Sequence, residues 1–396
     1  MKIIVNKYLN ARLNSPSTEE ACPYYRDPGY VLEVDDIEIG TEINGNCIWY
    51  HSSDDGCFYW SGGTGLTNDL LDKRRQSKSF TRQEEMGIYS SAVNELNYSG
   101  TDGEANQITG YKGIASGYKV IEKTGLTENR ICLIFYVRKK IVDPQVHVQD
   151  SINYRGFLLV TDVRVIGEIK LLQEGPDDSI PYPMGGSIAS LSSDGKENAR
   201  GTRSMLVQRA GKEYLLTCYH VACSILFAQH TYEFRNQKIE AIIPSKEKFP
   251  NSPTITATVI EGQFGINFDY ALLEVDITKF QNFMPGHLFN NGYYTLPEIK
   301  SQFTKETILI KYGAKTGERQ GKFKAYPAKV PVDDKKSLSM FGLIEVENIS
   351  DKGDSGAPVV DSQNKLVGII VAGVDSSSFI IPIAQLEFLF HFSPIL

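Results

Sequence analysis

The chain has 396 residues, of which 41 are Lys or Arg and 48 are Asp or Glu, so its formal net charge is −7. At about 100–200 residues per domain, this length predicts two to four domains. A composition that is 41% hydrophobic and 22% charged excludes global disorder and coiled coil. The slight acidity argues against a dedicated nucleic-acid binder, which normally carries a basic stripe.

Two features bear on the compartment. The apolar runs, such as residues 368–374, are far shorter than the ~18 residues that a membrane span needs. The apolar residues after Lys2 end at Asn6, which is too few for the apolar region of about 7–15 residues in a secretory signal. We therefore expect a cytoplasmic protein with no membrane contact. Its six cysteines, spread over the chain, predict reduced thiols rather than a disulfide framework.

The first sixty residues predict a small all-β barrel. Both tryptophans and many tyrosines lie there, and turn residues such as Asn44-Gly45-Asn46 separate short strand-like runs. Short strands at this spacing are typical of a small barrel. The expected strands are Lys2–Val5, Tyr30–Val34, Thr41–Ile43, Cys47–His51 and Phe58–Trp60.

The order of residues in this region resembles a bacterial SH3-like domain over about residues 1–63. The segment YLNARLNSPST is similar to that family's opening segment, and NGNCIWYHSSDDGCFYWSGG is similar to its closing pair of strands. The resemblance implies a surface groove for an extended peptide or a glycan. The candidate groove residues are Tyr8, Trp49, Tyr59 and Trp60. The alternative, that these rings fill a small core, stays open.

Residues 64–80 are expected to be a linker, because the Ser/Gly-rich stretch that leads into them is flexible. The short basic cluster in it is more typical of a solvated face than of a nucleic-acid contact. Its members are Lys73, Arg74, Arg75 and Lys78.

Residues 81–172 predict a compact α+β accessory domain. A helix is expected over Arg82–Asn97, where apolar residues recur every three or four positions, and Thr81 with Glu84 fits a capping box. Three strand-like runs follow, and ICLIFYV in the second is apolar on both faces, as in a covered sheet. The runs are Ile108–Val120, Ile131–Val137 and Leu158–Ile169.

Residues 173–185, with three prolines and two glycines, predict a second linker. The remaining residues, 186–396, are rich in strand patterns with closely spaced turns. This length of β pattern suits two small barrels. A short helix is expected near the end, over Pro382–Phe392.

Three segments of this last region carry chemistry. An apolar strand ends at His220, an Asp at position 269 precedes an apolar strand, and Ser355 lies between two glycines in DKGDSGAPVV. A serine hydroxyl is a weak nucleophile that needs an adjacent base. His220 suits that role, and a buried carboxylate such as Asp269 would fix its tautomer. The backbone N–H groups of Gly353 and Ser355 are the candidate oxyanion donors.

The order His, Asp, Ser and the local sequences resemble the chymotrypsin/trypsin-like serine peptidases. The resemblance implies a double β-barrel with the triad in the cleft between the barrels. GIIVAG at 368–373 is similar to that family's cleft-lining strand, so Val371, Ala372 and Gly373 would contact substrate. KYGAKTG at 311–317 is similar to a strand–turn of bacterial members. YVRKK at 136–140, VTDV at 160–163 and GGSI at 185–188 extend the likeness to about residues 105–396.

The sequence also departs from secreted members of that family. Val221 stands where they have a cysteine, and no basic residue precedes an activation-type N-terminus, so Asp354 has no assured partner. Zinc at Cys218, His220 and Cys223 is an unfavoured alternative, because three ligands at this spacing are too few. No cofactor or metal is expected.

The resemblance also bears on specificity. Position 349, an isoleucine, would form the base of the pocket for the residue before the cleaved bond, which favours an apolar or small side chain. A shifted register would instead bring Glu345, Glu347 or Asp351 into that pocket.

The leading hypothesis is a regulated cytoplasmic serine endopeptidase that acts on a protein substrate. An activating partner or ligand would control it, and a bacterial defence effector is one setting. The alternative is a binding or scaffold protein on a protease fold that no longer cleaves.

Overall fold

The computed structural model describes most of the chain, with the elements and bounds given below. The described residues are 1–19, 21–66, 80–96, 110–121, 126–138, 148, 150–167, 170–171, 185–234, 238–246, 249–276, 289, 291–333 and 338–395. They form two compact units, residues 1–165 and 166–396. The basic cluster of residues 73–78 and nearly all of the expected linker 173–185 lie outside the described residues. No described helix is long and apolar enough to cross a membrane.

The first unit begins with a six-stranded sheet in the order β1-β4-β5-β6-β2-β3. Its strands are β1 (Lys2–Ile4), β2 (Leu9–Arg12), β3 (Ala21–Arg26), β4 (Val31–Ile43), β5 (Asn46–Ser52) and β6 (Phe58–Trp60). The two runs expected at 30–34 and 41–43 form the single strand β4. Asn44 and Gly45 both have positive φ, as a two-residue hairpin turn between β4 and β5 requires.

The second part of this unit holds the expected helix, α1 (Arg82–Glu95). The capping box is present, because the Thr81 hydroxyl accepts from the Glu84 N–H and the Glu84 carboxylate accepts from the Thr81 N–H. The predicted apolar face of α1, including Met86, Tyr89 and Val93, is buried. The local capping signal and the 3.6-residue period were therefore sufficient to predict this helix.

A four-stranded group in the order β7-β8-β10-β9 completes this unit, with β8 and β10 parallel. Its strands are β7 (Tyr111–Ile121), β8 (Leu126–Val137), β9 (Ser151–Tyr154) and β10 (Phe157–Val165). The ICLIFYV residues of β8 are buried on both faces, as expected. Strand β10 ends at Val165, earlier than the expected Ile169.

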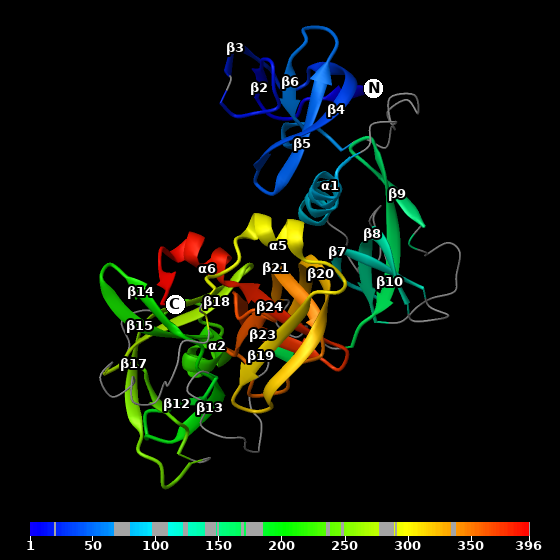
Figure 1. Ribbon diagram of the computed structural model, residues 1–396. Helices are drawn as coiled ribbons and strands as arrows, with labels where there is room; N and C mark the ends of the chain where they lie inside the picture. The colour runs from blue at the N-terminus through cyan, green and yellow to red at the C-terminus, as the bar shows by residue number, and fades with distance from the viewer. Residues whose placement is uncertain are drawn as a thin grey trace. The chain divides into compact units, whose positions relative to one another are not determined.

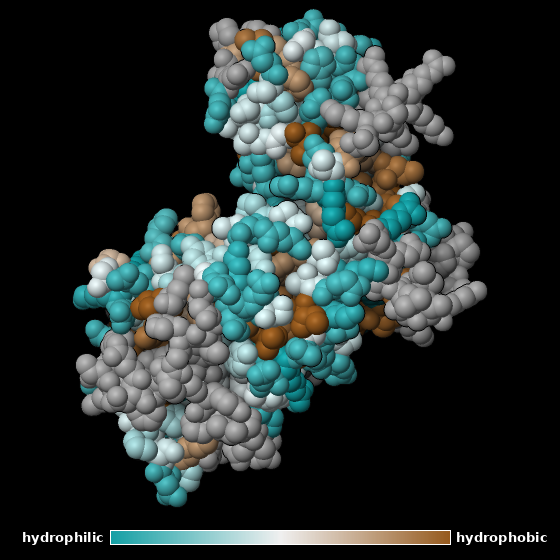
Figure 2. All heavy atoms as spheres, viewed as in Figure 1, coloured by the Kyte–Doolittle hydropathy of each residue, from teal (hydrophilic) through white to brown (hydrophobic). Residues whose placement is uncertain are grey.

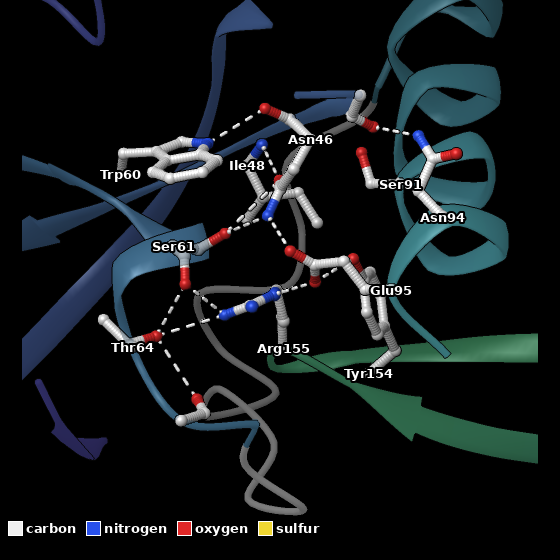
Figure 3. A network of polar contacts seen from close by, with 12 residues as sticks. Asn46, Ile48, Trp60, Ser61, Thr64, Ser91, Asn94, Glu95, Tyr154 and Arg155 are labelled. Atoms are coloured by element: carbon white, nitrogen blue, oxygen red, sulfur yellow. Dashed lines mark hydrogen bonds and ion pairs between the residues drawn. The ribbon is translucent and has the colours of Figure 1, made fainter. Parts of the chain in front are cut away.

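A buried polar network joins the first sheet to the helix and to the β9–β10 turn (Figure 3). Arg155, in that turn, donates from Nε to Glu95 at 2.5 Å and from a guanidinium nitrogen to Thr64 Oγ1 at 3.1 Å. Glu95 also accepts from Asn46 Nδ2 at 2.6 Å and from the Tyr154 hydroxyl at 2.7 Å. The two parts expected as separate domains therefore lie within one unit, and the hydrogen bond from Asn46 to Glu95 connects the first sheet to the Glu95–Arg155 ion pair.

We predict that Glu95→Gln destabilises the first unit by about 3–5 kcal/mol, because it leaves the Arg155 guanidinium buried without a counter-charge. Both tryptophans, Trp49 and Trp60, belong to this unit. Denaturant unfolding followed by tryptophan fluorescence therefore reports on it directly.

The matched control is Glu33→Gln, which breaks the exposed Lys2–Glu33 pair of the same unit and should leave the midpoint unchanged. Equal midpoints for Glu95→Gln and the control would show that the buried network does not hold the unit together.

The second unit contains two groups of strands. The first is ordered β13-β12-β16-β17-β18-β15-β14-β25. Its strands are β12 (Ser187–Leu191), β13 (Glu197–Thr202), β14 (Leu206–Arg209), β15 (Lys212–Thr217), β16 (Glu240–Ile243), β17 (Ile255–Gly265), β18 (Phe268–Glu274) and β25 (Ser393–Pro394). Strand β25 pairs with β14, so the end of the chain returns to this first group (Figure 1).

The other group closes into a barrel. Its strands follow the order β19-β22-β23-β24-β21-β20, and β19 also pairs with β20. They are β19 (Ile308–Gly313), β20 (Gly317–Asp333), β21 (Leu338–Glu347), β22 (Pro358–Asp361), β23 (Leu366–Val374) and β24 (Ser377–Pro382). The expected fold class, mainly β, is confirmed, and one of the two expected barrels closes through the pairing of β19 with β20.

The helices of this unit are short, and each sits at the end of a strand or between two strands. They are α2 (Tyr219–Ala222), α3 (Ser224–Ala228), α5 (Leu296–Gln302) and α6 (Ile383–Phe390). Helix α6 is the expected C-terminal helix. In the view of Figure 2 the surface is mainly hydrophilic, and hydrophobic residues appear on it in small groups.

Candidate catalytic site

Two neighbouring strands of the first group, β15 and β18, place His220 and Asp269 next to each other. His220 lies in α2, directly after β15, and Asp269 lies near the start of β18. These strands pair antiparallel, with Thr217 opposite Ala271. The Asp269 carboxylate accepts from the His220 backbone N–H at 3.2 Å and is hydrogen-bonded to the ring Nδ1. Two contacts to one carboxylate fix both the position and the orientation of the imidazole.

Ser355 approaches the imidazole from the closed barrel. It lies in the turn that precedes β22, and its Oγ is 2.9 Å from His220 Nε2. The same hydroxyl lies 3.3 Å from the Val371 carbonyl of β23. His220, Asp269 and Ser355 are all 0% exposed. The structure thus brings together all three residues that the sequence singled out. His220 and Asp269 come from the first strand group, and Ser355 comes from the closed barrel.

The glycines around Ser355 meet a steric requirement. Gly353 and Gly356 have φ of 102° and 90°, values that residues with a Cβ rarely adopt. A Cβ on Gly356 would also lie 2.1 Å from the Thr202 carbonyl oxygen. The turn that presents Ser355 therefore needs glycine at position 356.

Two backbone donors beside Ser355 are free in the described part of the chain. Neither the Gly353 N–H nor the Ser355 N–H donates a hydrogen bond to any described residue. The intervening Asp354 N–H, in contrast, donates to the Asp351 carbonyl at 3.0 Å. Free N–H groups of a nucleophilic residue and of the residue two positions before it can stabilise an oxyanion that forms beside the nucleophile.

The residue before the nucleophile, Asp354, is held by a buried ion pair. Lys311 Nζ of β19 lies 3.0 Å from Asp354 Oδ2, and both side chains are fully buried. Four more donors converge on the same carboxylate: the Thr316 hydroxyl at 2.6 Å, and the backbone N–H groups of Asp351, Lys315 and Thr316 at 3.0–3.2 Å. Five donors on one carboxylate fix the loop that carries Ser355.

The sequence around Lys311 explains how this pair fits. Gly313 is essential here, because a Cβ at this position would lie 2.3 Å from Asp354 Oδ1. Burial lowers the pKa of the Lys311 ammonium, and the adjacent Asp354 carboxylate opposes that shift. The sequence alone did not identify this partner of Asp354, although Lys311 is the first residue of the KYGAKTG motif. The signal was the lysine two residues before a glycine at the end of a strand.

We predict that Lys311→Met slows the reaction of Ser355 with phenylmethanesulfonyl fluoride by about 100-fold or more. The buried Asp354 carboxylate would lose its counter-charge, and the loop with the two free N–H groups would rearrange. Intact mass measured against time gives the rate of modification.

Lys322→Met is the matched control, because Lys322 pairs with Glu306 at the surface, and it should react at the wild-type rate. If Lys311→Met fails to fold, the double variant with Asp354→Asn removes both charges and restores folding, but not the rate. An unchanged rate in Lys311→Met would contradict the assigned role.

The cysteines near His220 do not form the zinc set considered from the sequence. The cluster that the described residues form is Cys218, His220 and Asp269, all buried. Burial raises the pKa of the Cys218 thiol well above its usual value, and the thiol donates to the Ile370 carbonyl. A neutral, hydrogen-bonded thiol is a poor zinc ligand. The geometry of this group suits proton transfer better than metal binding.

The residues considered for specificity take distinct positions. Ile349 is fully buried, and its N–H donates to the Ser378 hydroxyl of β24. Glu345 is buried and paired with Lys324, and it also accepts from Ser377. The carboxylates of the other two candidates accept backbone N–H groups, Glu347 from Lys322 and Asp351 from Lys352. Val371, Ala372 and Gly373 lie in β23, as expected.

The prediction of an aromatic groove in the first unit is wrong for two of its four residues. Trp49 and Tyr59 are 1% and 0% exposed, so they belong to the core of the first sheet. Trp60 donates from its indole to the Asn46 carbonyl. Tyr8 is 71% exposed and makes an edge contact with the ring of Tyr25. Of the four rings, two are unavailable to a ligand, because they are buried in the core of the first sheet.

Thr202 is a second residue that the sequence analysis missed. Its hydroxyl donates to the Gly353 carbonyl at 2.9 Å and accepts from the Ala314 N–H, and its own N–H donates to the Ser355 carbonyl. It therefore links β13 of the first strand group to the nucleophile loop. Nothing local in its sequence signals this long-range contact.

Comparisons with known proteins give distant likenesses only. No family model and no curated protein matches the chain. Among solved structures, Thermobifida fusca Protease A is 16% identical, with a TM-score of 0.37, over 54% of this chain and 97% of that protein. Nocardiopsis protease is 14% identical with the same TM-score, over 54% of this chain and 100% of its own. Cellulomonas bogoriensis chymotrypsin is 16% identical, with a TM-score of 0.34, over 54% and 97%. At these TM-scores the likenesses add nothing to what the geometry of the site says about activity.

Proposed function

We propose that the chain is a serine endopeptidase that hydrolyses peptide bonds of a protein substrate. The observation that carries this proposal is the linear array Asp269–His220–Ser355, with Nε2 and Oγ 2.9 Å apart. A base within hydrogen-bond reach of a serine, itself oriented by a carboxylate, is the arrangement that activates a hydroxyl.

In the proposed reaction, Ser355 Oγ attacks the carbonyl carbon of the substrate and its proton passes to His220 Nε2. The carbonyl π electrons move to the oxygen, and the Gly353 and Ser355 N–H groups stabilise that oxyanion. When the oxyanion collapses, the C–N bond breaks and His220 gives its proton to the departing amine. Water, deprotonated by His220, then hydrolyses the acyl ester and restores Ser355.

Several finer features belong to the same proposal. The setting is the bacterial cytoplasm, which the small number of cysteines and their wide spacing along the chain support, because neither is typical of a disulfide framework. Residues 1–165, whose first part is expected to be SH3-like, serve as an accessory unit that restricts targets or activity. The activity of the protease is regulated, and a role in defence fits such a regulated enzyme. A target, an activator and a ligand for the accessory unit are proposed partners.

The alternative function is a scaffold on an inactive protease fold. The N–H groups at Gly353 and Ser355 argue against it, because a scaffold has no need to leave two donors free beside a serine within the described part of the chain.

We predict that Ser355→Ala abolishes cleavage of cellular proteins while the fold is retained, because no other group can form the acyl ester. The measurement compares new protein N-termini, identified by mass spectrometry, after incubation of a cell lysate with the wild type or with the variant.

Ser192→Ala is the matched control, since Ser192 is partly exposed and, among the described residues, forms hydrogen bonds only within its own turn, with Asp194, Gly195 and Lys196. It should give the wild-type set of cleavage sites. The same new N-termini in Ser355→Ala would refute the endopeptidase, and binding without any cleavage by the wild type would support the scaffold.

A further inference from the structure

One edge of β23 changes partner close to Ser355. Strand β22 pairs with β23 only as far as Ile369, and the Ile370 backbone bonds with Gly356 and Ala357. Strand β24 covers the opposite edge of β23 up to Val374. A strand has two edges. From Val371 to Val374, β22 no longer pairs with its edge of β23, so that edge can pair with another segment.

This stretch begins at the candidate nucleophile. The Val371 carbonyl lies 3.3 Å from Ser355 Oγ. The register of β23 with β24 slips between Ile370 and Ala372, so Val371 is an extra residue on its strand. Bulges of this kind redirect the backbone near active sites. An extended peptide that pairs with this edge is therefore led to the Ser355 hydroxyl.

The chain itself places a strand there. Strand β11 (Lys170–Leu171) pairs antiparallel with β23, with Lys170 opposite Gly373 and Leu171 opposite Ala372. Since β24 occupies the other edge at both positions, β11 must lie on the edge that β22 leaves. The pairing uses the backbone, which is how a strand adds to a sheet edge regardless of its sequence.

The direction of β11 is that of a substrate. An acyl ester retains the N-terminal part of a cleaved chain, so that part must extend away from Ser355. In β11 the residue nearer Val371 is Leu171 and the earlier residue, Lys170, lies farther along β23. The chain thus approaches Ser355 in the N-to-C direction, as the acyl part of a substrate does.

We propose that β11 occupies the Val371–Val374 edge of β23 in cis and competes there with the substrate peptides of the proposed endopeptidase. This proposal rests on the endopeptidase proposed above and adds its regulation. A tethered segment acts at an effective concentration of the order of millimolar, so it competes well with a dilute protein substrate.

The test uses the full chain with Lys170→Pro and Leu171→Pro, made separately. Neighbouring residues of a strand point their N–H groups in opposite directions, so one of the two prolines removes a donor that faces β23. We expect one or both variants to cleave fluorescent casein with a KM about tenfold lower than the wild type and a kcat within twofold of it.

Asp178→Pro is the matched control, because it lies in the same linker sequence but outside β11, and its KM should stay at the wild-type value. Turnover of p-nitrophenyl acetate should be equal in all four proteins, because a small ester needs Ser355 but no strand pairing. If both β11 variants misfold, a synthetic peptide of residues 166–173 must inhibit casein cleavage by the wild type competitively.

The outcomes separate the two proposals. If all four proteins turn over the ester and have the same KM for casein, the cis competition is overturned but the endopeptidase is not. An equal gain on ester and casein also overturns it, since β11 would then shape the site rather than fill the edge. No turnover of either substrate by any of the proteins overturns the endopeptidase itself.

Discussion

The buried ion pair between Lys311 and Asp354 is the interaction on which the site depends. Asp354 directly precedes Ser355, so whatever holds its carboxylate also sets the backbone of the nucleophile loop. A buried pair contributes little net stability compared with apolar residues of similar size, because both charges lose water. Its value here is positional, since the carboxylate has five donors with fixed directions and therefore one favourable orientation.

A second constraint is that the site is built from both strand groups of the same unit. His220 and Asp269 are fixed relative to each other by the pairing of β15 with β18. Ser355 belongs to the closed barrel, and Thr202 connects its loop to β13 of the first group. The Nε2–Oγ distance thus depends on how the two groups pack. Within the closed barrel, the pairing of β22 with β23 places the β23 edge next to the serine, which links binding to chemistry.

The local parts of this architecture were predictable from the sequence. The α1 helix follows from its apolar period and capping box, and the hairpin between β4 and β5 follows from Asn44-Gly45. Ser355 was predictable because the positive φ at positions 353 and 356 demands glycine, which leaves a visible motif around the serine. His220 and Asp269 were recognisable because each stands at the end of an apolar strand run.

The rest depended on contacts between distant segments. The partner of Asp354 lies 43 residues away at Lys311, and nothing local reveals that this lysine is buried. The strands β2 and β3 were missed because β2 has only four residues and β3 contains a proline, which normally argues against a strand. The groove residues Trp49 and Tyr59 were misjudged because burial of a ring is decided by what packs on it. The pairing of β11 with β23 could not be predicted, because it depends on the strand register and on which edge of β23 lacks a partner, and only the folded chain shows these.

A burst experiment with p-nitrophenyl acetate shows whether His220 activates Ser355 as a nucleophile. If Ser355 is the nucleophile, one nitrophenol per chain is released rapidly, and an acetyl group is found on the peptide that contains Ser355. If His220 activates it, the His220→Ala variant shows neither. A burst that persists in that variant, or an acetyl group confined to another residue, would contradict the account.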